Sequence, residues 1–299
     1  MSRTYVETNG KRLSLTNLEK DLYPPSGFTK AEILNYYRGM APFMLPHLRD
    51  RAATLKRYPD GADKDFFFEK RCPEHRPEWV KTAEVSQTRG DPIRFCLIND
   101  METLIWAGNL AALELHVPLA RAGSSRTPDS LVFDLDPGEG AGIAECARVA
   151  LILRDLLSRM RLAAWVKTSG RKGLHVFVPL NNGETSFDDT KTFSKATAEI
   201  MQKHYPDLVT ARIAKQERAG KVFINWSQND ASKTMVCVYS LRAGEAPFVS
   251  FPLEWKALEG PGLDADRIRV LPGEALSRTL EQGDLFREVL MKEQKLPHL

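Results

Sequence analysis

The hydrophobic and polar positions of the chain follow two periods, one typical of strands and one of helices. Residues 130–138 are an apolar run of β-favouring residues that ends in two carboxylates, Asp134 and Asp136, and is closed by Pro137 and Gly138. This pattern predicts a buried strand that stops at the edge of a sheet. Because side chains alternate along a strand, both carboxylates lie on the same face, about 6.5 Å apart.

The rest of the chain mixes helical and strand patterns. Apolar spacing predicts a helix capped by Thr29 and further helices at about 101–116, 143–160, 188–204 and 280–294; strands are expected at 52–59, 92–98, 163–168, 176–179 and 222–226. His116 then ends a helix, where a protonated imidazole favours the helix dipole, and Asp188 or Asp189 caps another. This order predicts an α+β fold of mixed and antiparallel sheets flanked by helices, with residues 1–299 forming a single domain.

Composition narrows the function only slightly. The chain has 299 residues, of which 42% are hydrophobic, so it can bury a substantial core. No apolar run approaches membrane-spanning length and the start lacks an apolar signal core, so we expect a cytoplasmic protein without a membrane partner. Lys and Arg number 42 against 39 Asp and Glu, so any nucleic-acid surface must be local.

The four cysteines show no close pairing. Reduced thiols are therefore the expectation, and no disulfide framework is implied. Cys72 and His75 have the spacing of metal ligands, but a zinc site needs a second pair that the sequence does not offer.

The Asp134–Asp136 pair has several interpretations. Two carboxylates this close repel one another unless a cation lies between them, which favours a site for two divalent ions. Solvated carboxylates at a strand end are the plain alternative. A calcium loop fails because Gly138 and Glu139 occupy its fifth and sixth places. A phosphatase of the haloacid dehalogenase type also begins with Asp-x-Asp, with Asp188 and Asp189 as its distal acids, but that pair precedes a helical pattern.

Two further segments carry candidate binding chemistry. Ser169-Gly-Arg-Lys172-Gly is a turn whose glycines, hydroxyl and cations suit phosphate oxygens, although such hairpins are also common without a ligand. Phe66, Phe67 and Phe68 cannot all face inward on a strand, and exposed rings beside cations stack with unpaired bases. Packing under a neighbouring element is the alternative for these rings, and a solvated helix face is the alternative for the basic residues 211–221.

Three motifs in this order resemble the polymerase domain of bacterial DNA ligase D and its stand-alone relatives, within the archaeo-eukaryotic primase superfamily. They are Phe-Asp134-Leu-Asp136-Pro-Gly, Thr-Ser169-Gly-Arg-Lys-Gly-Leu-His175 and Gly-Lys-Val-Phe-Ile-Asn225-Trp-Ser-Gln228-Asn. The resemblance covers nearly the whole chain. It implies a primase-like core that extends DNA 3′ ends and fills short gaps at double-strand breaks in non-homologous end joining, using Mn²⁺ or Mg²⁺ and preferring ribonucleotides.

The resemblance also implies roles for individual residues. Asp134 and Asp136 bind both metal ions, and His175 belongs to the catalytic site. The nucleotide-binding residues implied are Lys56, His116, Ser169, Lys172, Arg218, Gln228 and Arg242. Lys20 and Lys30 match a pocket for the 5′ phosphate of a gap, and Phe67 and Phe68 match a template-stacking pair. Nucleoside triphosphates and gapped or broken DNA are the implied partners, together with Ku and a DNA ligase.

Asn225 departs from the family pattern, in which a third aspartate at this position binds the metal that activates the primer hydroxyl. An amide oxygen can coordinate a hard cation but carries no negative charge, so that ion should bind more weakly. We therefore expect impaired catalysis. A non-catalytic module that binds and bridges DNA ends is the alternative function.

Overall fold

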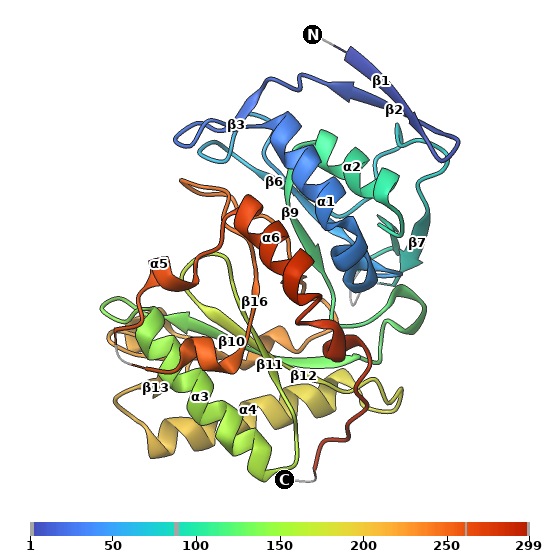
Figure 1. Ribbon diagram of the computed structural model, residues 1–299. Coiled ribbons are helices and arrows are strands. Elements are labelled where there is room, and N and C mark those ends of the chain that lie inside the picture. Colours follow the sequence, from blue (N-terminus) through green and yellow to red (C-terminus); the bar gives the residue numbers. More distant parts are fainter. Residues whose placement is uncertain (1–2, 87–89, 261, 298–299) are drawn as a thin grey trace. The chain divides into compact units, whose positions relative to one another are not determined.

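The apolar run that ends in the acid pair forms strand β10 (Ser130–Pro137), as its pattern predicts. The computed structural model describes residues 3–86, 90–260 and 262–297 (Figure 1). The chain divides into two units. Unit 1 comprises Met1–Gly123, Thr234–Val249 and Val270–Gly283; unit 2 comprises Ser124–Lys233, Ser250–Arg269 and Asp284–Leu299. Each unit is thus assembled from segments that are distant in sequence, and the expected single domain remains a prediction.

Unit 2 is built on a six-stranded sheet with β10 in its interior. The strands follow the order β13 (Val209–Thr210), β14 (Val222–Asn225), β10, β12 (Leu174–Pro179), β11 (Trp165–Thr168) and β16 (Pro252–Leu253). All neighbours are antiparallel except β13 and β14, which are parallel. Strand β10 therefore has a partner on each side, and its residues Leu131, Phe133 and Leu135 are completely buried.

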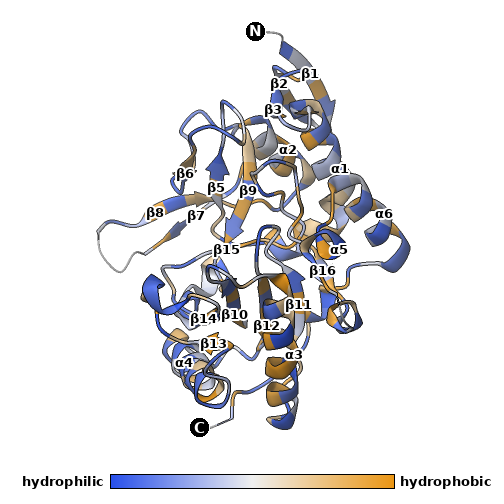
Figure 2. Cartoon of the chain, turned by 90° about the vertical axis from the view of Figure 1, so that its left-hand side faces the viewer, coloured by the Kyte–Doolittle hydropathy of each residue, from blue (hydrophilic) through white to orange (hydrophobic). Residues whose placement is uncertain are grey.

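Two helices pack on this sheet, α3 (Ile143–Arg159) and α4 (Phe187–His204), and both contact β10. In Figure 2, α3 carries orange and blue residues, consistent with an amphipathic helix. Helix α4 begins earlier than a cap at Asp188 or Asp189 would place it. Ser186 is its N-cap and forms a capping box with Asp189, so the prediction that Asp188 or Asp189 is the cap was wrong.

Short 3₁₀ helices complete unit 2: η2 (Lys215–Glu217), η3 (Trp226–Gln228), η4 (Trp255–Leu258) and η5 (Arg287–Leu290), with the four-residue helix α5 (Ala265–Ile268).

Unit 1 contains an antiparallel four-stranded sheet in the order β15 (Met235–Val236), β9 (Ala112–Val117), β5 (Thr54–Arg57) and β6 (Phe67–Glu69). Three hairpins accompany it: β1 (Arg3–Thr8) with β2 (Lys11–Thr16), β3 (Asp21–Tyr23) with β4 (Phe28–Thr29), and β7 (Thr82–Val85) with β8 (Ile93–Cys96). Helix α1 (Lys30–Leu48) packs on α2 (Met101–Asn109) and α6 (Pro272–Gln282), and a short 3₁₀ helix, η1 (Ala122–Ser124), lies at the end of the first segment. Thr29 caps α1 as predicted.

Two predicted helices do not extend as their apolar spacing indicates. Helix α2 stops at Asn109, and Ala111 has a φ of 58°, so the chain turns and continues as β9. His116 therefore lies in a strand, and its predicted place at a helix end was wrong. Pairing of β9 with β5 outweighs the helical propensity of these residues. At the C-terminus, the helix expected at about 280–294 was wrong: Gly283 ends α6 with a φ of 78°, and in the described residues up to 297 the four-residue η5 is the helix that follows.

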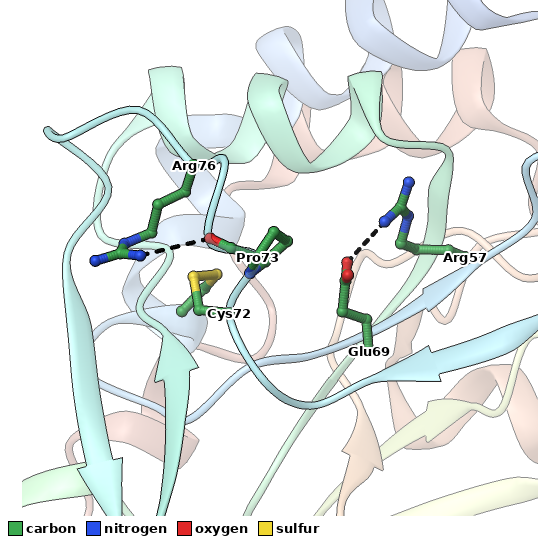
Figure 3. Close-up of a disulfide and its surroundings, with 6 residues drawn as sticks. Arg57, Glu69, Cys72, Pro73 and Arg76 are labelled. Atoms are coloured by element: carbon green, nitrogen blue, oxygen red, sulfur yellow. Dashed lines mark hydrogen bonds and ion pairs between the residues drawn. A yellow bond between two sulfur atoms is a disulfide. The ribbon is translucent and has the colours of Figure 1, made fainter.

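Cys72 and Cys96 form a disulfide (Figure 3), so the expectation of reduced thiols was wrong for this pair. The backbone N–H of Cys72 donates to the carbonyl of Arg94, 2.7 Å away, which brings Cys72 beside β8 and its last residue, Cys96. Sequence spacing could not show this, because the 24-residue separation is closed by tertiary contacts. The disulfide also removes Cys72 from any zinc site with His75. Cys146 and Cys237 are free and buried.

Over the described ranges, no helix is both long enough and apolar enough to cross a membrane.

Candidate active site

Four strands of unit 2 place one polar residue each in a single row across the sheet. Lys167 on β11 is directly opposite His175 on β12, which is opposite Asp134 on β10, which in turn is opposite Asn225 on β14. Directly opposite residues on neighbouring strands have side chains close enough to interact. The register therefore assembles three of the predicted site residues, His175, Asp134 and Asn225, and adds Lys167 to them.

Asp134 is in contact with its neighbours on both sides of this row. Its Oδ1 lies 3.3 Å from Nε2 of His175, and its Oδ2 accepts hydrogen bonds from the amides of Asn225 (3.1 Å) and Gln228 (3.4 Å). Burial by itself raises the pKa of Asp134, but hydrogen bonding to His175, Gln228 and Asn225 outweighs it and lowers that pKa. Asp134 is therefore held as a carboxylate, the form that binds cations.

Asp136 lies one residue beyond Leu135 on β10, at the end of the strand, and is half-buried. The turn that follows needs glycine, because a Cβ on Gly138 would lie 1.9 Å from the backbone oxygen of Arg218. Glycine thus allows the Arg218 segment to run close to the strand that bears both acids. Arg218 follows η2, and its guanidinium stacks on Phe223 at 3.8 Å and donates to the carbonyl of Ile213. The basic segment 211–221 is therefore not a helix face.

The turn between β11 and β12 has the tight backbone that its sequence predicts. The backbone N–H groups of Arg171 and Gly173 donate to Oγ of Ser169, at 3.2 and 3.1 Å. These two donors consequently stabilise the turn itself. Arg171 and Lys172 are exposed, so the side-chain cations remain the groups that can meet phosphate oxygens.

The donor set of Asp134, Asp136 and Asn225 decides whether a divalent cation fits. Carboxylate oxygens on one strand face are ligands that Mg²⁺ and Mn²⁺ accept. The amide of Asn225 is engaged at both ends, since Nδ2 donates to Asp134 and Oδ1 accepts from Ser227 at 2.7 Å. No cluster of three or more His, Cys, Asp or Glu able to hold a metal occurs in the part of the chain that the structure describes. Two carboxylates on one strand face fit a hard divalent cation that binds only one or two protein carboxylates, as Mg²⁺ commonly does.

In unit 1, the predicted nucleotide-binding residues Lys56, His116 and Arg242 gather around one buried acid, Glu114 on β9. Glu114 has no exposed side-chain surface; its oxygens lie 3.4 Å from Nζ of Lys56, 2.9 Å from Nε2 of His116 and 3.4 Å from Nε of Arg242. The hydroxyl of Tyr58 also donates to it, at 3.1 Å. Burial raises the pKa of Glu114, but His116, Arg242 and Lys56 together hold it well below its usual range. For His116, burial is the largest influence and lowers its pKa.

The three phenylalanines of unit 1 are all about half exposed, with Phe66 at 48%, Phe67 at 44% and Phe68 at 54%. Packing beneath a neighbour is therefore not their role. Nζ of Lys56 lies 3.9 Å from the centre of the Phe66 ring and 5.6 Å from that of Phe68, whereas the Arg57 guanidinium lies over Phe67 at 5.0 Å. Successive side chains of a strand point to opposite faces, so the Phe67 ring contacts Arg57 whereas the rings of Phe66 and Phe68 contact Lys56.

Lys20 and Lys30 lie next to each other in unit 1, because the backbone N–H of Lys30 donates to the carbonyl of Lys20, 2.8 Å away. The ammonium of Lys30 donates to the carbonyl of Thr16 (2.7 Å), and that of Lys20 to the carbonyl of Pro59 (2.6 Å). Burial, and then the nearby charges of Lys20 and Arg57, lower the pKa of Lys30 to about 8. A phosphate would relieve this repulsion.

Sequence reasoning missed Glu114 and Lys167. Each is a charged residue in a largely buried strand, Ala112–Val117 for Glu114 and Trp165–Thr168 for Lys167. An isolated charge in a buried strand must find a partner. The sequence shows both charges, but the segment around Glu114 was predicted to be a helix, so Glu114 was not recognised as a charge in a strand.

Comparison with known proteins identifies similar chains. Residues 29–286 match the family model described as LigD, primase-polymerase domain. The chain is 40% identical over 287 residues to the multifunctional non-homologous end joining DNA repair protein LigD of Mycobacterium tuberculosis, covering 93% of this chain and 37% of that protein. It is 30% identical to the bifunctional non-homologous end joining protein LigD of Bacillus subtilis, covering 83% of this chain and 40% of the relative. This chain thus spans well under half the length of these relatives.

A solved structure agrees with the sequence comparisons. The polymerase domain of Mycobacterium tuberculosis ligase D, determined in complex with DNA, superposes with a TM-score of 0.87 at 40% identity and covers 95% of this chain and 99% of that one. The predicted α+β fold of helices and largely antiparallel sheets is confirmed.

Proposed function

Because the chain belongs to the LigD primase-polymerase domain family, we propose that it is a nucleotidyltransferase that extends DNA 3′ ends and fills short gaps during non-homologous end joining, with a preference for ribonucleotides. The observation that carries this proposal is the cross-strand row of His175, Asp134 and Asn225, with Asp136 at the end of the same strand. Two carboxylates at the end of an interior strand, beside a basic turn, suit a triphosphate substrate.

In this proposal, Asp134 and Asp136 hold Mn²⁺ or Mg²⁺. When bound, such ions neutralise charge on the triphosphate and lower the pKa of the attacking hydroxyl. The chain's own residues keep Asp134 ionised and in place, because His175 and Gln228 hydrogen-bond it, and the turn at Ser169 presents Lys172 to phosphate oxygens. Arg218, anchored on Phe223, supplies a further cation.

Residues of unit 1 also have proposed binding roles. Lys56, His116 and Arg242, held by Glu114, bind the nucleotide, and Phe67 and Phe68 stack with template bases. Lys20 and Lys30 bind the 5′ phosphate across the gap. The exposure of the rings and the repulsion between the two lysines support these roles.

Asn225 favours a second candidate function. Its neutral amide donates to Asp134 where a third carboxylate would bind a cation, so this chain is proposed to be catalytically impaired. The alternative is a non-catalytic module that binds and bridges DNA ends. Ku and a DNA ligase are proposed partners in either case, and the cytoplasm is the proposed location.

Primer extension across a short gap with a 5′ phosphate tests both functions. The chain and its Asn225→Asp variant are supplied with Mn²⁺ and either ribo- or deoxyribonucleoside triphosphates, and Asp134→Ala serves as the inactive control. Extension by both proteins establishes a polymerase, and extension by Asn225→Asp alone establishes an impaired one. Extension by neither, with DNA ends still bound, supports the bridging module.

A further inference from the structure

Lys167 is a buried lysine in the middle of the unit 2 sheet, and the proposed chemistry does not use it directly. Only 1% of its surface is exposed. Its Nζ lies 2.9 Å from Nδ1 of His175, 2.6 Å from Oγ of Ser250 and 5.8 Å from the centre of the Phe177 ring. Lysine is almost never fully buried unless it is paired, so this placement calls for a role.

The hydrogen bonds around Lys167 determine which atom of His175 carries a proton. Oγ of Ser250 donates its hydrogen to the carbonyl of Thr168, 2.8 Å away, and therefore accepts from Lys167. An ammonium has three donors and no acceptor, and the face of Phe177 favours a cation. Nδ1 of His175 must then accept from Lys167, which leaves the ring proton on Nε2, the atom that faces Oδ1 of Asp134.

We infer that Lys167 is a positioning residue that holds His175 in the tautomer protonated at Nε2, with that N–H directed at Asp134. The tautomer of His175 does not depend on the proposed function; only the role of His175 in catalysis rests on it. Without Lys167, Nδ1 is free to take the ring proton, and Nε2 then presents a lone pair to the carboxylate of Asp134. That arrangement is repulsive, so both the orientation of His175 and the hydrogen bond to Asp134 are lost.

Nitrogen-15 NMR of the full chain with labelled histidine tests the inference without metal, nucleotide or DNA. The His175 signals are assigned from their loss in His175→Asn. In the unmodified chain we expect a protonated Nε2 and an unprotonated Nδ1. A proton on Nδ1 overturns the inference, and this measurement needs no Lys167 variant.

Lys167→Met removes the donor while keeping side-chain length. We expect the His175 signals to shift towards a protonated Nδ1, whereas Lys256→Met, which removes an exposed lysine of the same unit, should leave them unchanged. Circular dichroism establishes whether each variant is folded. An unchanged His175 tautomer in folded Lys167→Met overturns the inference; if that variant does not fold, the spectrum of the unmodified chain decides.

Incorporation kinetics then separate this inference from the proposed function. Lys167→Met is introduced into the unmodified chain or into Asn225→Asp, whichever incorporates nucleotides. It should lower kcat about 10- to 100-fold, because losing a group that orients a site residue usually costs this much. The KM for DNA should stay unchanged. An unchanged kcat contradicts the positioning role. Absence of incorporation by both parent proteins contradicts the proposed polymerase and leaves the NMR result intact.

Discussion

Nδ2 of Asn225 donates a hydrogen bond to Oδ2 of Asp134 across 3.1 Å, between directly paired residues of β14 and β10. An aspartate at position 225 would instead place a third carboxylate beside this acid pair. The amide therefore stabilises the row when no cation is bound. In exchange, the site lacks a third carboxylate that could bind a cation.

Asn225→Asp should exchange stability for cation binding. Without divalent ions, we expect a loss of about 1–3 kcal/mol in the free energy of unfolding, because Asp134 loses a donor and gains a like charge. Mn²⁺ should restore most of this loss and raise nucleotide incorporation. Urea unfolding with and without Mn²⁺ checks the prediction. Gln216→Glu, the same change from amide to carboxylate at an exposed position of the same unit, is the control. Equal stability of the two proteins in metal-free buffer would contradict it.

Binding of a 5′ phosphate should weaken as the pH rises through about 8, since the pKa of Lys30 is lowered to about 8 and its neutral form does not attract phosphate. Fluorescence anisotropy with gapped DNA, with and without the 5′ phosphate, between pH 7 and 9.5 measures this. Lys30→Arg keeps its charge over the whole range and should flatten the dependence. A pH-independent preference for the 5′ phosphate in the unmodified chain counts against Lys30.

The lowered pKa of Lys30 weakens phosphate binding at high pH but has the opposite effect on the stability of the fold. Between about pH 8 and the usual lysine pKa of about 10.4, the unfolded chain binds more protons at this side chain than the folded chain. The contribution of Lys30 to the free energy of unfolding should therefore rise with pH in that window.

Glu114→Gln should destabilise unit 1 by about 3–5 kcal/mol, because it leaves Lys56 and Arg242 without their buried counter-charge. The lowered pKa of Glu114 stabilises the fold fully above the unfolded value of about 4.3, and this contribution is lost as the pH falls below it. Denaturant unfolding at pH 7 and at pH 3–4 should show the largest difference between the two proteins at pH 7. Glu84→Gln, in an exposed pair with Arg94, should cost at most about 1 kcal/mol.

Loss of the Cys72–Cys96 disulfide should cost about 3 kcal/mol, as expected for closing a loop of 24-residue separation. Thiol titration of the denatured, unreduced chain should find two thiols, and titration after reduction four. Urea unfolding of Cys72→Ser/Cys96→Ser beside the oxidised chain measures the stability. Four thiols before reduction would show that the pair is not oxidised in solution.

Much of the fold follows from local patterns in the sequence. The apolar run of β10 with its two acids, the amphipathic spacing of α3 and the capping box of α1 each depend on residues close together in the chain. Patterns of this kind are visible without any structure, because strand and helix periods are properties of short segments. The family motifs are likewise contiguous, so the sequence alone was enough to identify the acid pair and the basic turn.

Only the tertiary structure decided which distant residues meet. The register of β11, β12, β10 and β14 sets Lys167, His175, Asp134 and Asn225 in one row, and a shift of a single residue would turn any of these side chains to the other face. Pairing with β5 likewise made a strand of the segment around Glu114, and contact with β8 joined Cys72 to Cys96. These outcomes depend on packing and pairing energies between segments far apart in the chain, which no local pattern records.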